Sequence, residues 1–263
     1  MRVAVLHGQE QPAAASRVPP GTSRHRTGVG LPSAVAIRTG PTLHRPRRSA
    51  RAARAAALVL HGGTEVSLRP TRASATPAVR MLPFAWSLRR RGRRHGLAVW
   101  RLRYRVRGWN GDEMSPLADV RHALDEIHAR HGDVPVVLVG HSMGGRAAMR
   151  SAGGSARTLV GLAPWVPAGE PVSQLGGCRV LVVHGSTDRR TSPQRSLEFA
   201  REASTVAERI WYVALRGSGH AMLRRARQWH RLTTDFVLAS LGFASVPTVL
   251  VAADGERLVE RSL

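Results

Sequence analysis

The sequence predicts an α/β fold with a mostly parallel central sheet and helices on both faces. Two observations lead to this prediction. From Ala56 onward, short aliphatic runs alternate with stretches of helical length and periodicity, which is typical of parallel strands joined by crossover helices. The length of 263 residues suits one sizeable core. Cys178 is the single cysteine, so no disulfide forms within the chain, and we expect it to be a buried structural thiol.

The individual elements follow from hydrophobic patterning. Runs of aliphatic residues predict buried strands at residues 56–60, 97–104, 134–139, 158–162, 180–184 and 209–215. Between the second and third of these, Ser115-Pro116 is a helix start signal, and apolar residues recur at helical spacing from Leu117 until Gly132. Further helices are expected at residues 75–94, 194–207 and 222–241.

Composition divides the chain into three parts. Residues 1–54 are rich in Arg, Pro, Ser and Gly and lack sustained periodicity, so we interpret them as a disordered basic tail. Its opening, MRVAVLHG, is either a first strand, a strand-like segment that forms no strand, or upstream sequence translated from an extended reading frame. Residues 55–242 form the folded domain. Residues 243–263 are a C-terminal extension in which Asp254-Gly255 allows a β-hairpin.

The basic charge raises the possibility of nucleic-acid binding. The formal net charge is +23, and all 40 basic residues are arginine, which is the pattern of a GC-rich coding bias. Because no recognition helix or aromatic platform accompanies the charge, we expect no specific nucleic-acid partner. The chain also lacks the apolar segment of a signal peptide and any run long enough to span a membrane. We therefore expect a cytoplasmic protein with no membrane partner, and its oligomeric state is left open.

The run VLVGHSMGGR at residues 137–146 breaks a buried strand at a serine that is flanked by glycines. Gly140 and Gly144 stand two residues on either side of Ser142, and a helix is expected to follow. Such spacing allows a sharp strand-to-helix turn that lifts the serine hydroxyl out of the sheet. The motif is short enough to arise by chance, so its meaning depends on the rest of the chain.

A nucleophilic serine needs a base and a carboxylate that orients the base. Asp188 follows the strand in VLVVHGSTD, and His220 follows the next strand in LRGSGHAML. Parallel strands present their carboxyl ends at one edge of the sheet, so both side chains are expected near Ser142. Asp133 and Asp112 are weaker candidates for the acid.

The order Ser142, Asp188, His220, each placed after a strand, resembles the α/β-hydrolase superfamily over residues 56–241. This resemblance implies a three-layer sandwich in which residues 55–242 form the catalytic domain, and it implies a serine hydrolase without a cofactor. It also implies an oxyanion hole made by the backbone N–H groups of Gly63 and Met143, with Thr64 as an alternative to Gly63. The expected substrate is a small-molecule ester or thioester.

The resemblance also bears on the substrate pocket. Family members often carry a lid before the acid, but residues 166–178 are too few for one, so we expect an open, shallow pocket. Its expected walls come from the loops beside the triad, and they are Trp165, Trp109, Met143 and Met222. Arginines that could make the rim basic are Arg107, Arg146 and Arg189.

Three histidines end strands at the same edge. His61, His141 and His184 show no ligand spacing such as HExxH, so we expect no metal site. They are expected to brace the loops that carry the site, with His61 supporting the oxyanion turn.

Three hypotheses of function remain. The first is an esterase or thioesterase, and the same triad would also serve a peptidase or a perhydrolase. The second is a catalytically silent scaffold used for binding. The third is a nucleic-acid binder that uses the arginine-rich tail.

Overall fold

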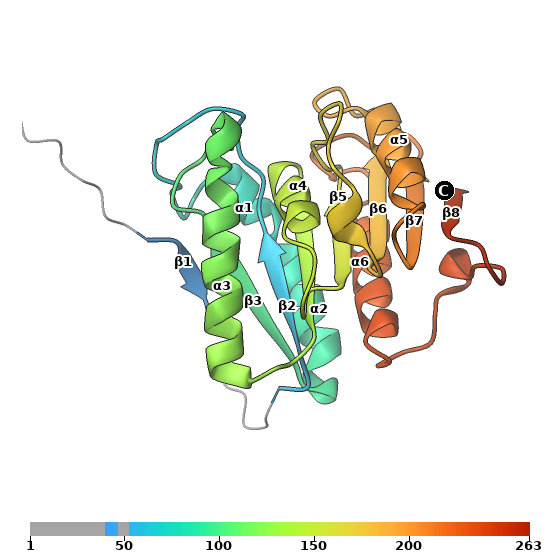
Figure 1. Cartoon of the computed structure of the whole chain (residues 1–263), viewed down its shortest axis with the longest axis horizontal. Coiled ribbons are helices and arrows are strands. Elements are labelled where there is room, and N and C mark those ends of the chain that lie inside the picture. The colour runs from blue at the N-terminus through green and yellow to red at the C-terminus, as the bar shows by residue number, and fades with distance from the viewer. Residues whose placement is uncertain (1–39, 47–52) are drawn as a thin grey trace, which may run out of the picture. The chain divides into compact units, whose positions relative to one another are not determined.

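The computed structural model describes residues 40–46 and 53–263. These residues form an eight-stranded sheet with the strand order β1-β3-β2-β4-β5-β6-β7-β8 (Figure 1). Every strand runs parallel to its neighbours except β1, which is antiparallel to β3. The strands are β1 (Thr42–His44), β2 (Ala55–Leu60), β3 (Leu97–Arg103), β4 (Val136–His141), β5 (Thr158–Leu162), β6 (Arg179–Gly185), β7 (Arg209–Leu215) and β8 (Leu258–Ser262).

Helices cover both faces of this sheet, which confirms the predicted fold class. The α-helices are α1 (Thr76–Arg80), α2 (Leu82–Gly92), α3 (Ser115–His131), α4 (Met143–Arg150), α5 (Pro193–Ala203) and α6 (Ala226–Ser240). Helices α3, α4 and α5 lie on the face turned toward the viewer in Figure 1, and α2 and α6 lie behind the sheet. Short 3₁₀ turns lie at η1 (Arg93–His95), η2 (Gly111–Glu113), η3 (Ser173–Leu175) and η4 (Thr248–Leu250).

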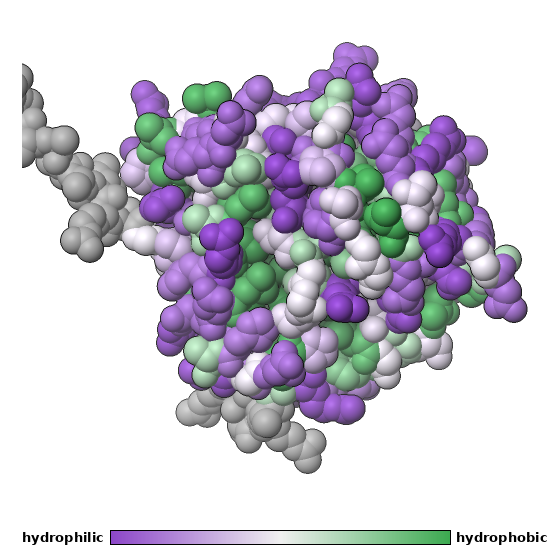
Figure 2. Space-filling model, viewed as in Figure 1, coloured by the Kyte–Doolittle hydropathy of each residue, from purple (hydrophilic) through white to green (hydrophobic). Residues whose placement is uncertain are grey.

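Strand β2 shows how the sheet divides the core. Its residues alternate, so Leu58 packs on the face covered by α3 to α5, and Val59 packs on the face covered by α2 and α6. All six β2 residues are buried, because a parallel strand covered on both faces has no side that contacts water. Polar residues predominate on the outer surface of the α3–α5 side, as Figure 2 shows.

The predicted strands and helices occur, with instructive differences at the helix ends. The stretch predicted as one helix at residues 75–94 divides at Met81 into α1 and α2, since Pro83 occupies the first turn of α2 and lacks an N–H group. The last helix begins at Ala226 instead of 222, because Met222 and Arg225 have φ of 59° and 58°, outside the helical region.

Two expectations for the chain ends need correction. Residues 42–44 lie within the predicted tail 1–54, yet they form edge strand β1, which pairs with Arg101–Arg103 of β3. The rest of that tail falls outside the described residues, apart from short flanking stretches. In the extension 243–263 the hairpin does not form: residues 248–250 make a 3₁₀ turn, and residues 258–262 pair in parallel with β7.

The edge formed by the carboxyl ends of the strands carries the loops predicted to hold the site. The loop after β2 begins at His61, the turn after β4 holds Ser142, and the loops after β6 and β7 hold Asp188 and His220. Within the described part of the chain, no helix combines the length and apolar character required to cross a bilayer.

Candidate active site

Ser142 occupies a strained turn between β4 and α4. Its φ of 55° and ψ of −120° fall outside the regions that non-glycine residues normally occupy. The backbone holds the turn on both sides: the Ser142 N–H donates to the Leu162 carbonyl at 3.0 Å, and the Ser142 carbonyl accepts from the Trp165 N–H at 3.1 Å. This geometry keeps the serine side chain at the edge of the sheet, where it is partly accessible to solvent.

The two glycines of the motif let backbone approach backbone. A Cβ on Gly140 would meet the carbonyl oxygen of Gly144. A Cβ on Gly144 would lie 2.5 Å from the His61 carbonyl oxygen and 2.7 Å from that of Leu60. These contacts are with backbone atoms, which cannot move aside as a flexible side chain can. Helix α4 therefore enters close to the end of β2.

The loop after β2 lies directly against the serine turn. A Cβ on Gly62 would lie 3.3 Å from the Ser142 Cβ, and one on Gly63 would lie 2.6 Å from the Met143 sulfur. The Thr64 N–H already donates to the Arg107 carbonyl at 2.9 Å. Within the described residues, the N–H groups of Gly63 and Met143 donate to no protein acceptor. Of the N–H groups considered for the oxyanion hole, these two remain available.

His61 supports this loop in the way expected from the sequence. Its Nδ1 donates to the Gly62 carbonyl at 2.6 Å, and its Nε2 accepts from the Tyr104 N–H at 3.2 Å. Burial lowers the pKa of His61 to about 4, and the Gly62 hydrogen bond opposes this shift only in part. The ring is thus neutral at pH 7, which lets Nε2 act as an acceptor.

Asp188 and His220, the predicted acid and base, are hydrogen-bonded to each other. Asp188 Oδ2 lies 2.8 Å from His220 Nδ1. The Asp188 carboxylate has no exposed surface, and the His220 side chain is 13% exposed. Asp133 lies between α3 and β4 at the opposite edge of the sheet, and Asp112 lies in η2. The structure therefore pairs His220 with Asp188 and not with the two weaker candidates.

Several donors converge on the Asp188 carboxylate. Oδ1 accepts from the N–H groups of Arg190 at 2.8 Å and Thr191 at 3.1 Å, and Oδ2 accepts from the Thr191 hydroxyl at 2.9 Å. Burial alone would raise the pKa of Asp188. Hydrogen bonds from His184, His220 and the backbone outweigh burial and hold this pKa well below its ordinary value, so the group is ionised at pH 7.

His141, the residue before Ser142, contacts His220. Its Nε2 donates to the His220 carbonyl at 3.0 Å, and the two rings lie 4.7 Å apart. Burial and the nearby His220 lower the pKa of His141 to about 3, so its ring is neutral. Although His220 thus lies beside the residue that precedes Ser142, no hydrogen bond joins the Ser142 hydroxyl to the His220 ring in this structure. Catalytic hydrogen bonds are often loose in the absence of substrate.

A model of the alpha/beta hydrolase family matches residues 57–261. The chain belongs to this family. The match includes the serine turn, the Asp188 loop and the His220 loop. No curated protein matches the sequence.

Solved structures of other alpha/beta hydrolases share the fold at low identity. A putative alpha/beta hydrolase from Agrobacterium tumefaciens is 18% identical with a TM-score of 0.60, over 78% of this chain and 93% of that one. A serine hydrolase without a lid from Xanthomonas campestris is 19% identical with a TM-score of 0.53, over 75% and 87%. A thermophilic esterase from Thermogutta terrifontis is 16% identical with a TM-score of 0.56, over 79% and 89%.

This alpha/beta hydrolase has no lid domain between β5 and β6. The connection between them, residues 163–178, holds one 3₁₀ turn. It carries Trp165, which is partly exposed and is joined to the Ser142 backbone. The other predicted pocket walls are buried: Met143 is 1% exposed, Trp109 is 2% exposed and Met222 is 3% exposed. Trp165 is thus the one of the four that presents surface beside Ser142.

Arg146, predicted as a rim charge, belongs instead to a packed cluster. Its guanidinium lies 4.0 Å from the Trp109 ring centre and 4.6 Å from that of Trp165. It also bonds to the buried carboxylate of Glu170 at 2.7 Å. Its charge is therefore compensated within the protein, while Arg107 and Arg189 are exposed. Nothing in the sequence pattern identified Glu170, because its partner lies more than twenty residues away.

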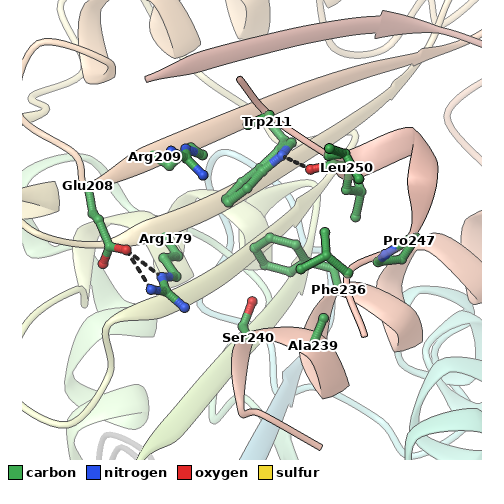
Figure 3. Close-up of a pocket in the computed structure, with 12 residues that line it drawn as sticks. Arg179, Glu208, Arg209, Trp211, Phe236, Ala239, Ser240, Pro247 and Leu250 are labelled. Atoms are coloured by element: carbon green, nitrogen blue, oxygen red, sulfur yellow. Dashed lines mark hydrogen bonds and ion pairs between the residues drawn. The ribbon is translucent and has the colours of Figure 1, made fainter. Parts of the chain in front are cut away.

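A separate cavity of about 300 Å³ lies away from Ser142, beside the first residues of β6 and β7, the end of α6 and the segment 246–252. Figure 3 shows that Trp211 of β7 and Phe236 of α6 line it, and the Trp211 indole N–H donates to the Leu250 carbonyl at 2.8 Å. None of the predicted site residues lines this cavity. The candidate site is therefore the carboxyl edge of the sheet, where Ser142, Asp188 and His220 lie.

Proposed function

We propose that this alpha/beta hydrolase is a serine hydrolase that cleaves a carboxylic ester or thioester through an acyl-enzyme on Ser142. The observation that carries the proposal is the Asp188–His220 pair, joined at 2.8 Å through a buried carboxylate, beside a serine held in a strained turn. A carboxylate and an imidazole that meet next to a raised serine are the parts that nucleophilic catalysis requires.

In the acylation step, His220 Nε2 takes the proton of the Ser142 hydroxyl while Oγ attacks the carbonyl carbon. The bond between Nδ1 and Asp188 fixes the imidazole so that Nε2 is the free acceptor, and it stabilises the imidazolium that forms. The tetrahedral intermediate then collapses, and His220 gives the proton to the departing alcohol or thiol.

The negative charge of the tetrahedral intermediate needs donors close to Ser142. The free N–H groups of Gly63 and Met143 supply them in the proposal, because both residues lie against the serine turn. Each donor of this kind contributes about 3 kcal/mol to the stability of a transition state. A water molecule, activated by His220, then attacks the acyl-enzyme and releases the acid.

An ester or thioester substrate agrees with the open site. The short β5–β6 connection leaves the serine without a lid, and Trp165 offers an apolar wall to an acyl group. Esterases are among the proteins with this fold. The triad needs no cofactor for this chemistry. The same groups would also serve peptide hydrolysis or perhydrolysis, so an anilide and hydrogen peroxide belong in the substrate panel.

The test is labelling with a fluorophosphonate probe, with wild type beside Ser142→Ala, followed by p-nitrophenyl esters of rising chain length. We expect wild type to label and to hydrolyse the esters, and the variant to do neither while it keeps the circular-dichroism spectrum of the wild type. A folded wild-type sample that does not label would leave a silent binding scaffold as the better account. Equal labelling of the variant would show that Ser142 is not the nucleophile.

A further inference from the structure

The Asp188 carboxylate has a second histidine beside it. His184 is the second-last residue of strand β6. Its Nε2 lies 3.2 Å from Asp188 Oδ2, the same oxygen that is hydrogen-bonded to His220. The same nitrogen lies 3.3 Å from the Thr191 hydroxyl, which donates to Oδ2 at 2.9 Å. The reaction proposed above uses His220 and assigns nothing to His184.

The other ring nitrogen of His184 is also engaged. Nδ1 lies 2.9 Å from the Ser196 hydroxyl of α5. Both residues are completely buried, so no water competes for these contacts. A buried polar chain therefore runs from α5 through His184 to the carboxylate.

The protonation of His184 Nε2 follows from its neighbours. A lone pair on Nε2 would face the negative Oδ2 at 3.2 Å, which is repulsive, so Nε2 carries a proton. Nδ1 and the Ser196 hydroxyl form the second hydrogen bond of the ring. The Nε2–H group is hydrogen-bonded to Thr191 Oγ1 and lies 3.2 Å from Asp188 Oδ2, and the Thr191 hydroxyl donates its own proton to the carboxylate.

We propose that His184 is a positioning residue for the reaction: its Nε2–H holds the Asp188 carboxylate in the orientation that directs Oδ2 at His220. This inference rests on the proposed function. His184 touches no substrate and acts through Asp188 alone. The backbone donors from Arg190 and Thr191 hold Oδ1, so His184 and Thr191 together determine how the second oxygen is presented.

The same contact influences the charge that His220 meets. A donor on Oδ2 draws off part of the carboxylate charge, so its loss would strengthen the attraction between Asp188 and the protonated His220 ring. Other groups around this pair also act on it. They are His141 from β4, which touches His220, Arg80 from α1, which acts on His141, and Arg190 from the Asp188 loop.

The experiment compares His184→Phe, which keeps a planar ring without a donor, with His184→Gln, which restores an N–H near the position of Nε2. For His184→Phe we expect kcat to fall by up to about 100-fold with KM little changed, because the orienting contact is lost. The acid limb of the kcat/KM profile should move to higher pH, and His184→Gln should reverse part of both changes. The matched control is His230→Phe, a half-buried histidine on α6, which should change neither quantity.

Two further measurements keep the test decisive if His184→Phe does not fold. Ser196→Ala removes the partner of Nδ1 and should produce a smaller change in the same direction. Nitrogen-15 NMR of the wild type should show that Nε2 of His184 carries a proton. An unprotonated Nε2 would overturn the inference, as would a folded His184→Phe variant that loses stability but keeps the wild-type kcat and acid limb.

The outcomes also separate this inference from the proposed function. A wild type that neither labels at Ser142 nor hydrolyses esters would overturn both. A wild type that labels, together with a His184→Phe variant of unchanged kinetics, would overturn the role of His184 alone.

Discussion

The turn that carries Ser142 and the loop that carries Asp188 lie two strands apart on the same edge of the sheet, yet different interactions hold them. Around Ser142 the contacts are between backbone atoms, and glycines at 140 and 144 make the close approach possible. Around Asp188 the contacts are hydrogen bonds to a buried carboxylate, from side chains and from two N–H groups.

This difference determines what each half tolerates. Added volume should damage the serine turn, where there is no room for a Cβ. Loss of a donor or of a charge should damage the Asp188 loop, where a buried polar group depends on its partners. A substitution that adds volume without changing charge tests the serine turn. A substitution that changes a donor or a charge at constant volume tests the Asp188 loop.

The largest expected effect is that of Asp188→Asn, which changes chemistry at nearly constant volume. We expect kcat to fall by about 10⁴-fold, because an amide favours the wrong tautomer of the paired imidazole. The measurement is ester hydrolysis at pH 8 by wild type and variant. The controls are Asp133→Asn and Asp112→Asn, which should retain wild-type rates. A neutral Asp188→Asn variant would contradict the pairing seen here.

Gly144→Ala tests the other half, since it adds one methyl group and no charge. The new Cβ would lie 2.5 Å from the His61 carbonyl oxygen and 2.7 Å from that of Leu60. We expect the free energy of unfolding to fall by about 3 kcal/mol, at the upper end of overpacking costs. Gly176→Ala is the control, because its Cβ would meet one atom at 3.5 Å. Equal stability of the two variants in urea would show that the serine turn accommodates volume.

Lowering the pH distinguishes the stability contributions of the serine turn and the Asp188 loop without any mutation. His61 and His141 are neutral in the fold, with pKa values lowered to about 4 and about 3, so the unfolded chain binds their protons first. Stability therefore falls as pH drops below about 6.5, by about 2 kcal/mol for each histidine at pH 5. Asp188 has a lowered pKa, so its contribution is present above about pH 4 and is lost only as pH falls further.

The measurement is urea unfolding at pH 7, 5 and 3.5. His141→Gln should lose less stability between pH 7 and 5 than the wild type, and the exposed His122→Gln should behave like the wild type. An identical pH dependence in all three proteins would contradict the neutral buried state of His141.

The same contrast explains how far the sequence could predict the molecule. The serine turn was predictable because glycines two residues on either side of Ser142 report a local backbone geometry. The strands were predictable from aliphatic runs, and Asp188 and His220 from their places after strands. These signals are local in sequence.

The partners of the buried polar groups were not predictable, because they come from distant elements. Ser196 of α5 reaches His184 of β6, and Glu170 reaches Arg146 of α4, without any spacing that marks the pair. Edge strand β1 was missed for a related reason: its three residues pair with β3 in a stretch whose composition is that of a tail.

The smallest expected effect is a gain in stability from volume added at a cavity. Ala239 of α6 lines the cavity of about 300 Å³ beside Trp211 and Phe236 (Figure 3). Ala239→Leu adds apolar volume where space exists, so we expect the free energy of unfolding to rise by up to about 1 kcal/mol. Activity should not change, because the cavity lies away from the triad. A loss of stability comparable to that of Gly144→Ala would mean that the free space around a residue does not decide whether the fold tolerates added volume there.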